Sequence, residues 1–445
     1  MVRPTAIRPG KPYIIQYGNL HTATTESNTG TVRRYFSYDA NDRLVYIYDR
    51  AQNRTSIVRD AGGTALAIVS PDGIRTELGI DTQNRLSEVR YPDGGYYTFE
   101  YTAGGLMTAE IDPKFNRFEH VYDANGRITD VTDPEGGDWR FDATNSADGT
   151  IRTELTTAEG QQTVYLDRTL PSGEFTSLIT GPSGGITDYR KSENGLTVNK
   201  SLSCGMDLLF EYAYDPGYRF KYIKSKTLTQ PSGLAKTVTE DRVYVDVDND
   251  RVLDKTTKTF TVNGNAFTYL IDKTTDRKTL TTPGGRTRSS GFDPDTGLTT
   301  WTNVPGLIDT TYGYDTRGWL IDVTRDVRQS RFAYDADGNL ASTTDPENRI
   351  TTFDYDPMGR MTGMHRPDNT SVWFDHDKNG NMTVLTNPLS VSHWFGYNSV
   401  DRNTSYQTPL SGSYAYIYDR DRRLVKTVLP SAKEINNIYR IFPSD

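Results

Sequence analysis

Aromatic and polar positions recur along this chain with a period of about 21 residues. An aspartate anchor marks the units at Asp315, Asp335, Asp356, Asp377 and Asp419, with Asn398 in register, and earlier at Asp39, Asp60, Asp81 and Asp123, with Thr102 in register. The residue before the anchor is usually aromatic, at Tyr38, Tyr101, Tyr122, Tyr314, Tyr334, Tyr355, Tyr397 and Tyr418, as is the residue three before it, at Phe36, Phe99, Tyr312, Phe332, Phe353, Phe374, Phe395 and Tyr416. Residues two apart on a strand share a face, so each unit predicts a strand with an aromatic pair on one side.

Two kinds of turn separate the predicted strands. After the anchor comes Asp-x-x-Gly-Arg or a close variant, as at 123–127 and 356–360. The aspartate can bond the backbone ahead of it, and glycine accepts positive φ, as expected of Gly126, Gly338 and Gly359. Eleven residues after the anchor a proline recurs, at Pro71, Pro92, Pro113, Pro134, Pro346, Pro367, Pro388, Pro409 and Pro430. Proline cannot donate to a central ladder, so each unit is predicted to be strand, Asp turn, strand, Pro turn.

The repeat predicts an all-β fold in which tandem hairpins form one long, curled antiparallel sheet, a partial hollow shell or barrel. About 21 units of two strands, at ~4.8 Å between strands, make a ribbon on the order of 200 Å that strand twist prevents from staying flat. We also expect the rings of neighbouring units to stack into a continuous column along one face.

Four segments are expected along the chain. Residues 1–30 are an N-terminal lead-in, 31–144 are regular repeats, 145–290 are degenerate repeats, and 291–445 are regular repeats that end inside a unit. An inserted module from Asp241 to Lys258 is the competing interpretation of the degenerate part. Because Tyr439 repeats the place of Tyr418 shortly before the last residue, we expect one segment of a larger shell or a truncated reading frame.

Composition argues against several classes of protein. The chain has 29 Tyr, 16 Phe and 5 Trp despite a mean hydropathy of -0.66, which is too aromatic for a disordered chain. Its net charge is -8 and its basic residues are scattered, which argues against a nucleic-acid partner. The single cysteine, Cys204, has no partner for an internal disulfide. Neither a signal peptide nor a membrane span is evident.

Candidate catalytic motifs are better explained by the repeat. Residues 181–185 match Gly-x-Ser-x-Gly, but a nucleophile elbow needs a helix after the serine, and here strands flank a Pro-Ser-Gly turn. The histidines, His21, His120, His365, His376 and His393, lack metal-ligand spacing. No phosphate-binding loop of the Gly-Lys-Ser/Thr type is present. We therefore predict no catalytic residue and no cofactor.

Two acidic runs are weak metal candidates, because closely spaced carboxylates can converge on one hard cation. The first contains Asp375 and Asp377, and the second contains Asp246, Asp248 and Asp250. Neither run has an acid at the position that closes a calcium loop, where Thr386 and Thr257 stand. The turn chemistry of the repeat already accounts for the first run.

The run Tyr-Asp-x-x-Gly-Arg followed by Pro-x-Gly at this period resembles the YD repeats of bacterial Rhs proteins, of the B and C components of insecticidal toxin complexes, and of teneurins. The resemblance implies a sheet that spirals into a hollow shell, which in the bacterial members encloses a C-terminal toxin. It thus implies a non-enzymatic shell segment that encapsulates or delivers a toxin in bacterial competition and is secreted or associated with the cell surface. Its partners would be the remainder of a larger shell or the toxin passenger.

The chain departs from that resemblance at one motif. Bacterial members carry a conserved core near the C-terminus, and the nearest fragment here, residues 292–298, lies in mid-chain. Self-cleavage is therefore not expected of this chain. A different function is the alternative: an exposed aromatic, Thr-rich face could bind carbohydrates or proteins of a cell surface.

Overall fold

The computed structural model describes residues 14–17, 20–25, 32–249, 253–410 and 412–439. Every regular element in them is a β-strand, and each strand pairs antiparallel with its neighbours in sequence, from β1 to β39. The predicted all-β sheet of tandem hairpins is confirmed. The described residues include no helix long and apolar enough to cross a membrane.

The strands of the first half are short at the start and lengthen toward mid-chain. They are β1 (Ile14–Tyr17), β2 (Leu20–Thr25), β3 (Val32–Tyr38), β4 (Leu44–Asp49), β5 (Arg54–Arg59), β6 (Ala65–Val69), β7 (Arg75–Ile80), β8 (Leu86–Arg90), β9 (Tyr96–Tyr101), β10 (Met107–Ile111), β11 (Arg117–Tyr122), β12 (Ile128–Thr132), β13 (Asp138–Asn145), β14 (Ile151–Thr156), β15 (Gln162–Thr169), β16 (Phe175–Thr180), β17 (Ile186–Lys191), β18 (Thr197–Leu202) and β19 (Asp207–Tyr214). The segment 1–30 thus contributes β1 and β2 to the sheet.

The second half begins with the longest strands and returns to the regular repeat. Its strands are β20 (Lys221–Thr229), β21 (Ala235–Val245), β22 (Lys255–Val262), β23 (Asn265–Asp272), β24 (Arg277–Thr281), β25 (Thr287–Phe292), β26 (Thr299–Asn303), β27 (Thr310–Tyr314), β28 (Leu320–Arg325), β29 (Arg328–Tyr334), β30 (Leu340–Thr344), β31 (Ile350–Tyr355), β32 (Met361–His365), β33 (Ser371–His376), β34 (Met382–Thr386), β35 (Ser392–Tyr397), β36 (Asn403–Gln407), β37 (Ser413–Tyr418), β38 (Leu424–Val428) and β39 (Glu434–Asn436). The run Asp241 to Lys258 spans the end of β21 and the start of β22, which pair within the same sheet.

The Asp turn has the geometry that its sequence predicts. In the turn between β31 and β32, Asp356 Oδ1 accepts hydrogen bonds from the backbone N–H groups of Met358 (2.9 Å) and Arg360 (3.0 Å). The glycine at the fourth position, Gly359, has φ +74°. Elsewhere Asn or Asp takes this left-handed position, as Asn84 does with φ 62°. At Asp123 the backbone N–H of Arg127 is the largest cause that holds the carboxyl pKa below its usual range.

In seven units, the tyrosine before the anchor bonds its unit to the preceding one. Its hydroxyl donates to a backbone carbonyl 14 or 15 residues earlier, at the residue that opens the second strand of the preceding hairpin. These bonds are Tyr101 to Leu86 (2.6 Å), Tyr122 to Met107 (2.7 Å), Tyr314 to Thr299 (2.8 Å), Tyr334 to Leu320 (3.0 Å), Tyr355 to Leu340 (3.0 Å), Tyr397 to Met382 (3.0 Å) and Tyr418 to Asn403 (2.8 Å). The tyrosines therefore share one orientation, as the repeat predicts.

The expected column of stacked tyrosine rings is replaced by these hydrogen bonds. Equivalent residues of successive units lie two strands apart, about 9.6 Å, which exceeds the 4.5–7 Å range of ring contacts. Ring contacts in the described residues form locally instead, as Tyr406 stacks between Phe395 (5.2 Å) and Tyr414 (5.7 Å) on adjacent strands.

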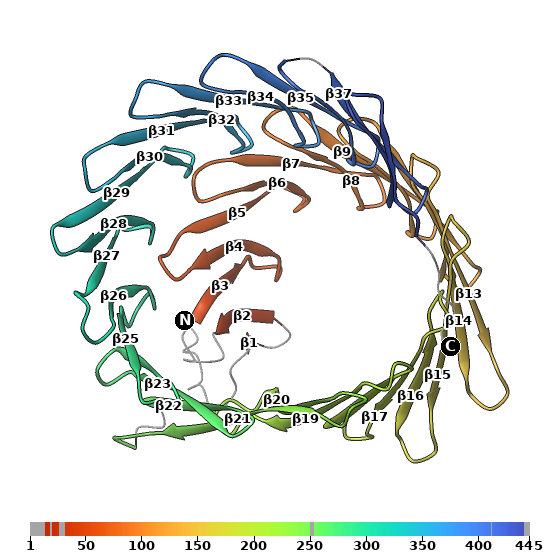
Figure 1. Cartoon of the computed structure of the whole chain (residues 1–445), viewed down its shortest axis with the longest axis horizontal. Helices are drawn as coiled ribbons and strands as arrows, with labels where there is room; N and C mark the ends of the chain where they lie inside the picture. Colours follow the sequence, from red (N-terminus) through yellow and green to blue (C-terminus); the bar gives the residue numbers. More distant parts are fainter. Residues whose placement is uncertain (1–13, 18–19, 26–31, 250–252, 411, 440–445) are drawn as a thin grey trace.

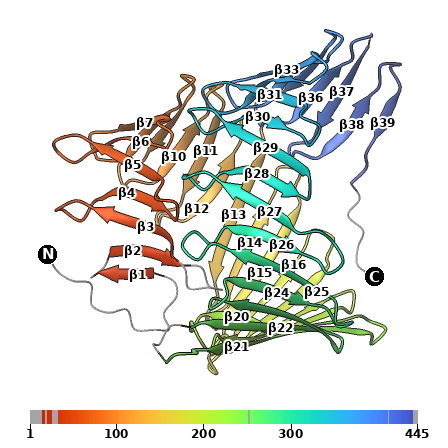
Figure 2. The ribbon, with the colours of Figure 1, turned by 90° about the vertical axis from the view of Figure 1, so that its left-hand side faces the viewer.

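The sheet curls until its last part lies beside its first part (Figure 1). We call β3–β15 the first coil and β25–β38 the last coil. Figure 2 shows the two coils side by side, with the long strands β19–β23 joining them at the base. The ribbon surrounds a central region that no strand crosses (Figure 1). The wall is a single sheet, so few side chains are buried in the described residues; the apolar ones are Ala23, Ala67, Ala109, Val198, Tyr218, Ile271, Phe292 and Val372.

Backbone hydrogen bonds and chirality identify the inner face of the last coil. The Thr370 carbonyl accepts from the Arg366 N–H (2.8 Å) and therefore points toward β32. The backbone N–H and C=O groups of successive strand residues point to alternate neighbouring strands, so those of Trp373, three residues later, point toward β34. Seen from its side chain with the strand running upward, an L-residue directs its own N–H and C=O to the right. The strands advance clockwise in Figure 1, and β33 runs toward the first coil, which lies behind. Trp373 therefore points away from the centre of the ring, and its neighbour Phe374 points toward it.

Candidate functional site

The two coils meet along a line of hairpin turns that we call the seam. On one rim of the first coil, the Pro turns at 70–73, 91–94, 112–116 and 133–137, and two turns without proline at 49–53 and 157–160, contact turns of the last coil. These are the Asp turns at 293–297, 315–318, 356–360, 377–381 and 419–423 and the equivalent Asn398 turn at 398–402. Most of these contacts join residues 245 to 267 positions apart. This separation is roughly 12 to 13 units of about 21 residues. Because both rims have a similar period, successive turns of the first coil meet turns of the last coil in the same order.

Ion pairs join the two coils at several points along the seam. Arg317 Nη1 lies 3.1 Å from an Asp72 oxygen, and Arg360 Nη2 lies 2.9 Å from an Asp93 oxygen. Further along, Arg422 Nε donates to Asp133 Oδ2 (2.9 Å). The Asp133 side chain is only 1% exposed. Such a charge-assisted contact at a buried carboxylate is among the stronger polar interactions.

Lys114 is the basic exception among the acidic residues that the Pro turns present to the seam. Its ammonium lies 2.9 Å from Asp377 Oδ2 and 3.3 Å from Asp401 Oδ1. Burial alone would raise the pKa of Asp377, but hydrogen bonds from Asn381 and Lys114 outweigh it and keep that pKa below its usual range. For the Lys114 pKa, burial acts downward and Asp377 acts upward, and the net direction is upward. Both shifts favour the charged pair.

Hydrogen bonds from uncharged donors fill the intervals between the ion pairs. Asn379 Nδ2 donates to Asp112 Oδ2 (2.6 Å), Thr157 Oγ1 to Asp421 Oδ2 (2.7 Å), Asn53 Nδ2 to the Arg317 carbonyl (2.8 Å) and the Ser399 N–H to Glu135 Oε1 (2.9 Å). The approach is close at Gly137, where a Cβ would lie 2.7 Å from the Arg420 carbonyl oxygen. A cavity of about 250 Å³ lies at this end of the seam, lined by Glu135, Arg402, Tyr418 and Arg422 among others.

The structure brings only some of the residues predicted from the repeat to the seam, and the seam itself was not among the predictions. Asp315, Asp335, Asp356 and Asp419 anchor turns of the last coil, whereas Asp39 and Asp123 anchor turns on the outer rim of the first coil. The available signal was a charged residue at the third position of successive Pro turns: Asp72, Asp93, Lys114, Glu135 and, in a turn without proline, Glu159. Sequence alone does not show that these turns face another coil.

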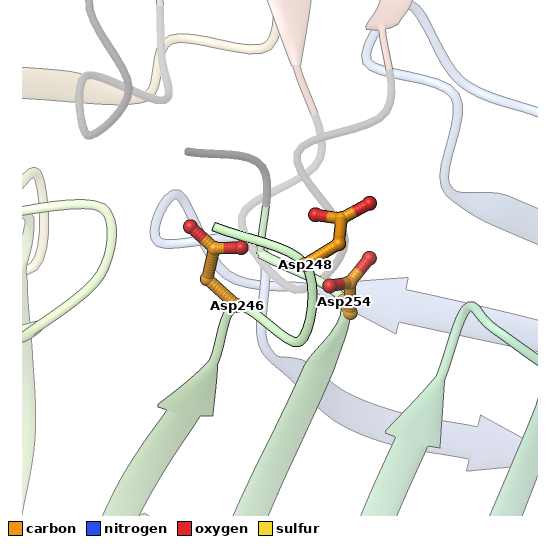
Figure 3. A group of neighbouring side chains, drawn as sticks. All are labelled: Asp246, Asp248 and Asp254. Carbon is orange, nitrogen blue, oxygen red and sulfur yellow. The ribbon is translucent and has the colours of Figure 1, made fainter. Parts of the chain in front are cut away.

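The second acidic run forms a small cluster at the tip of the hairpin β21–β22 (Figure 3). Carboxylate oxygens of Asp246, Asp248 and Asp254 lie within 4.8 Å of one another. The sequence analysis named the first two but not Asp254, and its third candidate, Asp250, lies outside the described residues. Asp254 Oδ2 accepts from the Val247 N–H (2.7 Å), which closes the loop by itself. Exposed acidic groups often gather without a metal.

The other candidate residues lie in ordinary parts of the sheet. Asp377 anchors an Asp turn and bonds Lys114, while Asp375 lies on β33 opposite Val384, so the structure does not gather these two carboxylates. Ser183 lies in the turn between β16 and β17, with a strand on either side. His365 contacts Asp354 (Nε2 to Oδ2, 2.7 Å) and Ser371 (Nδ1 to Oγ, 2.9 Å) on neighbouring strands.

A buried ionic network at mid-chain was not predicted at all. Asp215 is fully buried and accepts from Arg242 Nη1 (2.8 Å) and the Tyr244 hydroxyl (2.6 Å). Arg242 also donates to Glu240 (2.6 Å) and lies over the Tyr222 ring (4.1 Å). Burial, followed by the contact with Asp215, raises the pKa of Tyr244. The network packs the long strands where the sheet has no repeat regularity.

The chain matches the family model of the teneurin YD-shell over residues 15–441. No curated protein sequence matches it. Among solved structures, the Photorhabdus luminescens Tc holotoxin pore aligns with a TM-score of 0.49 and 14% identity over 91% of this chain and 24% of that chain. A TcdB2–TccC3 structure without the hypervariable C-terminal region aligns with a TM-score of 0.44 and 13% identity over 94% and 24%.

This chain spans about a quarter of the length of those two solved chains. The match to the YD-shell model, by contrast, covers nearly all of this chain, and the curled sheet, the Asp turns and the seam lie within it. The chain belongs to the teneurin YD-shell family.

Proposed function

We propose that this chain is part of the wall of a hollow shell that encloses a polypeptide passenger, which in bacterial competition would be a toxin. The seam is the observation that carries the proposal. Ion pairs such as Asp93 with Arg360 and Asp133 with Arg422 join segments more than 260 residues apart, so the curl is fixed by contacts and not only by twist. A wall that is held closed in this way can separate an interior from the solvent.

The inner face of the last coil supports an enclosing role. Phe353, Phe374 and Phe395 share the face of the sheet that points toward the centre, and all three are half-buried. An apolar lining can contact the apolar side chains that an unfolded passenger exposes. The function proposed is mechanical: the wall restricts a passenger and does not transform it. Further coils of a larger shell are its proposed partners, and delivery of a passenger implies action outside the producing cell.

Protease protection tests the proposal. The chain is fused at its C-terminus to an unstructured casein segment, and digestion of the casein by proteinase K is followed over time. We expect slower digestion of fused than of separately added casein. The double variant Asp72→Lys with Asp93→Lys places cations against Arg317 and Arg360, opens the seam, and should restore fast digestion.

A matched control keeps the charge change but removes it from the seam. Glu347 and Asp368 occupy the third position of Pro turns on the last coil, on the rim away from the first coil. The variant Glu347→Lys with Asp368→Lys should protect casein as well as the unmodified chain does. Equal digestion of fused and free casein would contradict the proposal. The alternative function, binding of carbohydrates or proteins of a cell surface, is favoured by exposed aromatic side chains such as Trp373 on β33 and Trp394 on β35.

A further inference from the structure

Two rims of the curled sheet have no neighbouring coil. One consists of the Asp turns of the first coil, at 39–43, 81–85 and 123–127, with their equivalents at 60–64 and 102–106, and we call it the Asp rim. The other consists of the Pro turns of the last coil, at 345–348, 366–369 and 387–390, and we call it the Pro rim. The two rims lie on opposite sides of the molecule (Figure 2). In the part of the chain that the structure describes, no side chain of the other coil bonds either rim.

The seam already joins these two kinds of turn. There, an acid at the third position of a Pro turn bonds an arginine of an Asp turn, as Asp93 bonds Arg360 (2.9 Å). The Pro turns of the seam belong to the first coil and its Asp turns to the last coil, so the two free rims offer the converse pair. Two copies of the chain placed head to tail would bring an Asp rim against a Pro rim and repeat the seam between molecules.

Arg85 on the Asp rim is held in the same way as Arg360 in the seam. Arg360 donates from Nε to its own anchor aspartate (2.6 Å), from Nη1 to the carbonyl of the next anchor (3.1 Å) and from Nη2 to the acid across the seam (2.9 Å). Arg85 donates from Nε to Asp81 (2.7 Å) and from Nη1 to the Thr102 carbonyl (2.8 Å). Among the described residues, its Nη2 reaches only Gln83 Oε1, at 3.2 Å. The guanidinium is therefore oriented in advance for an acid that this copy does not supply.

Asp368 on the Pro rim occupies the place that Asp93 has in the seam. In Asp93, Oδ1 accepts from the Gly95 N–H (2.9 Å) and Oδ2 accepts from the arginine across the seam. In Asp368, Oδ1 accepts from the Thr370 hydroxyl (2.7 Å) and N–H (3.0 Å), and no described residue donates to Oδ2. The hydroxyl of Thr370, followed by its N–H, holds the pKa of Asp368 below its usual range. The rim thus presents a charged carboxylate with one oxygen directed at no donor of its own coil.

Apolar side chains stand one turn further along each rim. Leu389, at the third position of the Pro turn after Asp368, is 82% exposed, and Leu106, at the fifth position of the turn after Arg85, is 36% exposed. A leucine this exposed is costly to leave in water unless a partner covers it. Because turns meet in the same order along the seam, a contact that sets Asp368 against Arg85 also sets Leu389 against Leu106. Charge and apolar surface then match at two successive turns.

We propose that the chain stacks head to tail on a second copy of itself, with the Pro rim of one copy bound to the Asp rim of the next. Asp368 accepts from Arg85 of the next copy, and Leu389 packs on Leu106 of the next copy. The contact joins two different surfaces, so it does not close on itself and each bound copy leaves one rim of each kind free. The inference rests on the proposed function, because the second copy supplies the further coil of a larger shell.

Sedimentation-velocity centrifugation over a series of concentrations tests the stack. We expect the mean mass of the full chain to rise with concentration, and Arg85→Gln and Asp368→Asn each to weaken association about tenfold or more by leaving the other partner unpaired at the interface. The double variant should associate as weakly as either single one, because both substitutions remove the same pair. Arg90→Gln is the matched control: Arg90 lies at the opposite end of β8 from the Asp rim and pairs with Glu88, so association should change less than about twofold. Circular dichroism melts show whether each variant remains folded.

Three results would overturn the stack. The chain stays monomeric up to millimolar concentration; or Arg85→Gln, still folded, associates as tightly as Arg90→Gln; or the losses in Arg85→Gln and Asp368→Asn add up in the double variant. Protection of fused casein by the monomer depends on the seam and not on these rims. Loss of stacking with protection retained therefore refutes only the stack, whereas loss of protection with stacking retained refutes only the enclosing role.

Discussion

Replacing Lys114 by methionine should weaken the seam at its centre. The substitution keeps the apolar stem and removes the ammonium that lies 2.9 Å from Asp377 and 3.3 Å from Asp401. Asp112 also approaches this point, because Asn379 Nδ2 bonds both Asp112 (2.6 Å) and Asp401 (3.1 Å). Without Lys114, three carboxylates would gather with no ammonium among them.

The size of the effect follows from the geometry. At 2.9 Å and an effective dielectric constant of 20, the Lys114–Asp377 attraction is about 6 kcal/mol before desolvation. The cost of removing the Lys114 ammonium from water offsets most of this attraction. The same desolvation is the largest single cause acting on the Lys114 pKa, and it acts downward. Asp401 is too exposed to add much. We therefore expect Lys114→Met to lower the free energy of unfolding by about 2 kcal/mol, as for other hydrogen bonds between charged groups.

Urea denaturation followed by tryptophan fluorescence measures this loss, and a cycle with Asp377→Asn isolates the pair. The folded pKa of Asp377 is lowered, so its contribution is present above the unfolded pKa of about 3.8 and is lost as pH falls through the folded value. The folded pKa of Lys114 is raised, so its contribution is present below about 10.5 and is lost as pH rises through the folded value. The effect should therefore be full between about pH 4 and pH 10.

A matched lysine provides the control. Lys433 is exposed and lies in the Pro turn that follows β38, on the rim away from the first coil. Lys433→Met should change the free energy of unfolding by less than about 0.5 kcal/mol. If Lys114→Met lowers the free energy of unfolding no more than Lys433→Met does at pH 7, the ion pair does not hold the coils together. The reasoning about the seam would then be refuted.

Three further changes test other parts of the fold. Tyr355→Phe removes the hydrogen bond from the tyrosine hydroxyl to the Leu340 carbonyl and should lower the free energy of unfolding in urea by about 1 kcal/mol. Tyr214→Phe, at an exposed tyrosine, should not change it measurably. Equal effects of the two substitutions would show that the hydrogen bond does not stabilise the sheet. Gly359→Ala should cost about 1–2 kcal/mol because φ is +74°, and Gly359→Asn should cost less, since Asn adopts this φ in other turns; the opposite order in thermal melts would argue against left-handed strain. Asp215→Ala should cost about 3–5 kcal/mol by leaving Arg242 and Tyr244 without their buried partner, and an unchanged melting temperature would contradict this.

Local structure could be predicted from the sequence because each signal acts within one or two units. The Asp turn needs only its own residues, as Asp356, Met358 and Arg360 show. The shared orientation of the tyrosines follows from alternation along a strand. The stacked column was wrong because it treated units as adjacent strands, whereas equivalent residues lie two strands apart. Because of this separation, the tyrosine hydroxyl reaches a backbone carbonyl of the preceding hairpin, and the tyrosine ring does not reach the equivalent ring of the next unit.

Contacts between coils could not be predicted in the same way, because their spacing depends on curvature. The separation of 267 residues between Asp93 and Arg360 is set by how many strands complete one turn, and small twists accumulated over many strands determine that number. The acidic loop shows the same limit, since Asp254 joins Asp246 and Asp248 only once β21 and β22 have paired. The geometry of a turn is set by its own residues, whereas the contact between the two coils depends on the curvature of the whole sheet.

The single-layer wall explains why closure depends on turns. A sheet without a covering layer leaves both faces in contact with water or contents, so it cannot be stabilised by a thick core. The remaining places where distant segments meet are its rims, and hairpin turns form those rims. Polar turn residues such as Asp93 and Lys114 therefore serve twice, shaping their own turn and joining the next coil. In such a shell, turn residues carry the long-range contacts that core residues carry in a globular domain.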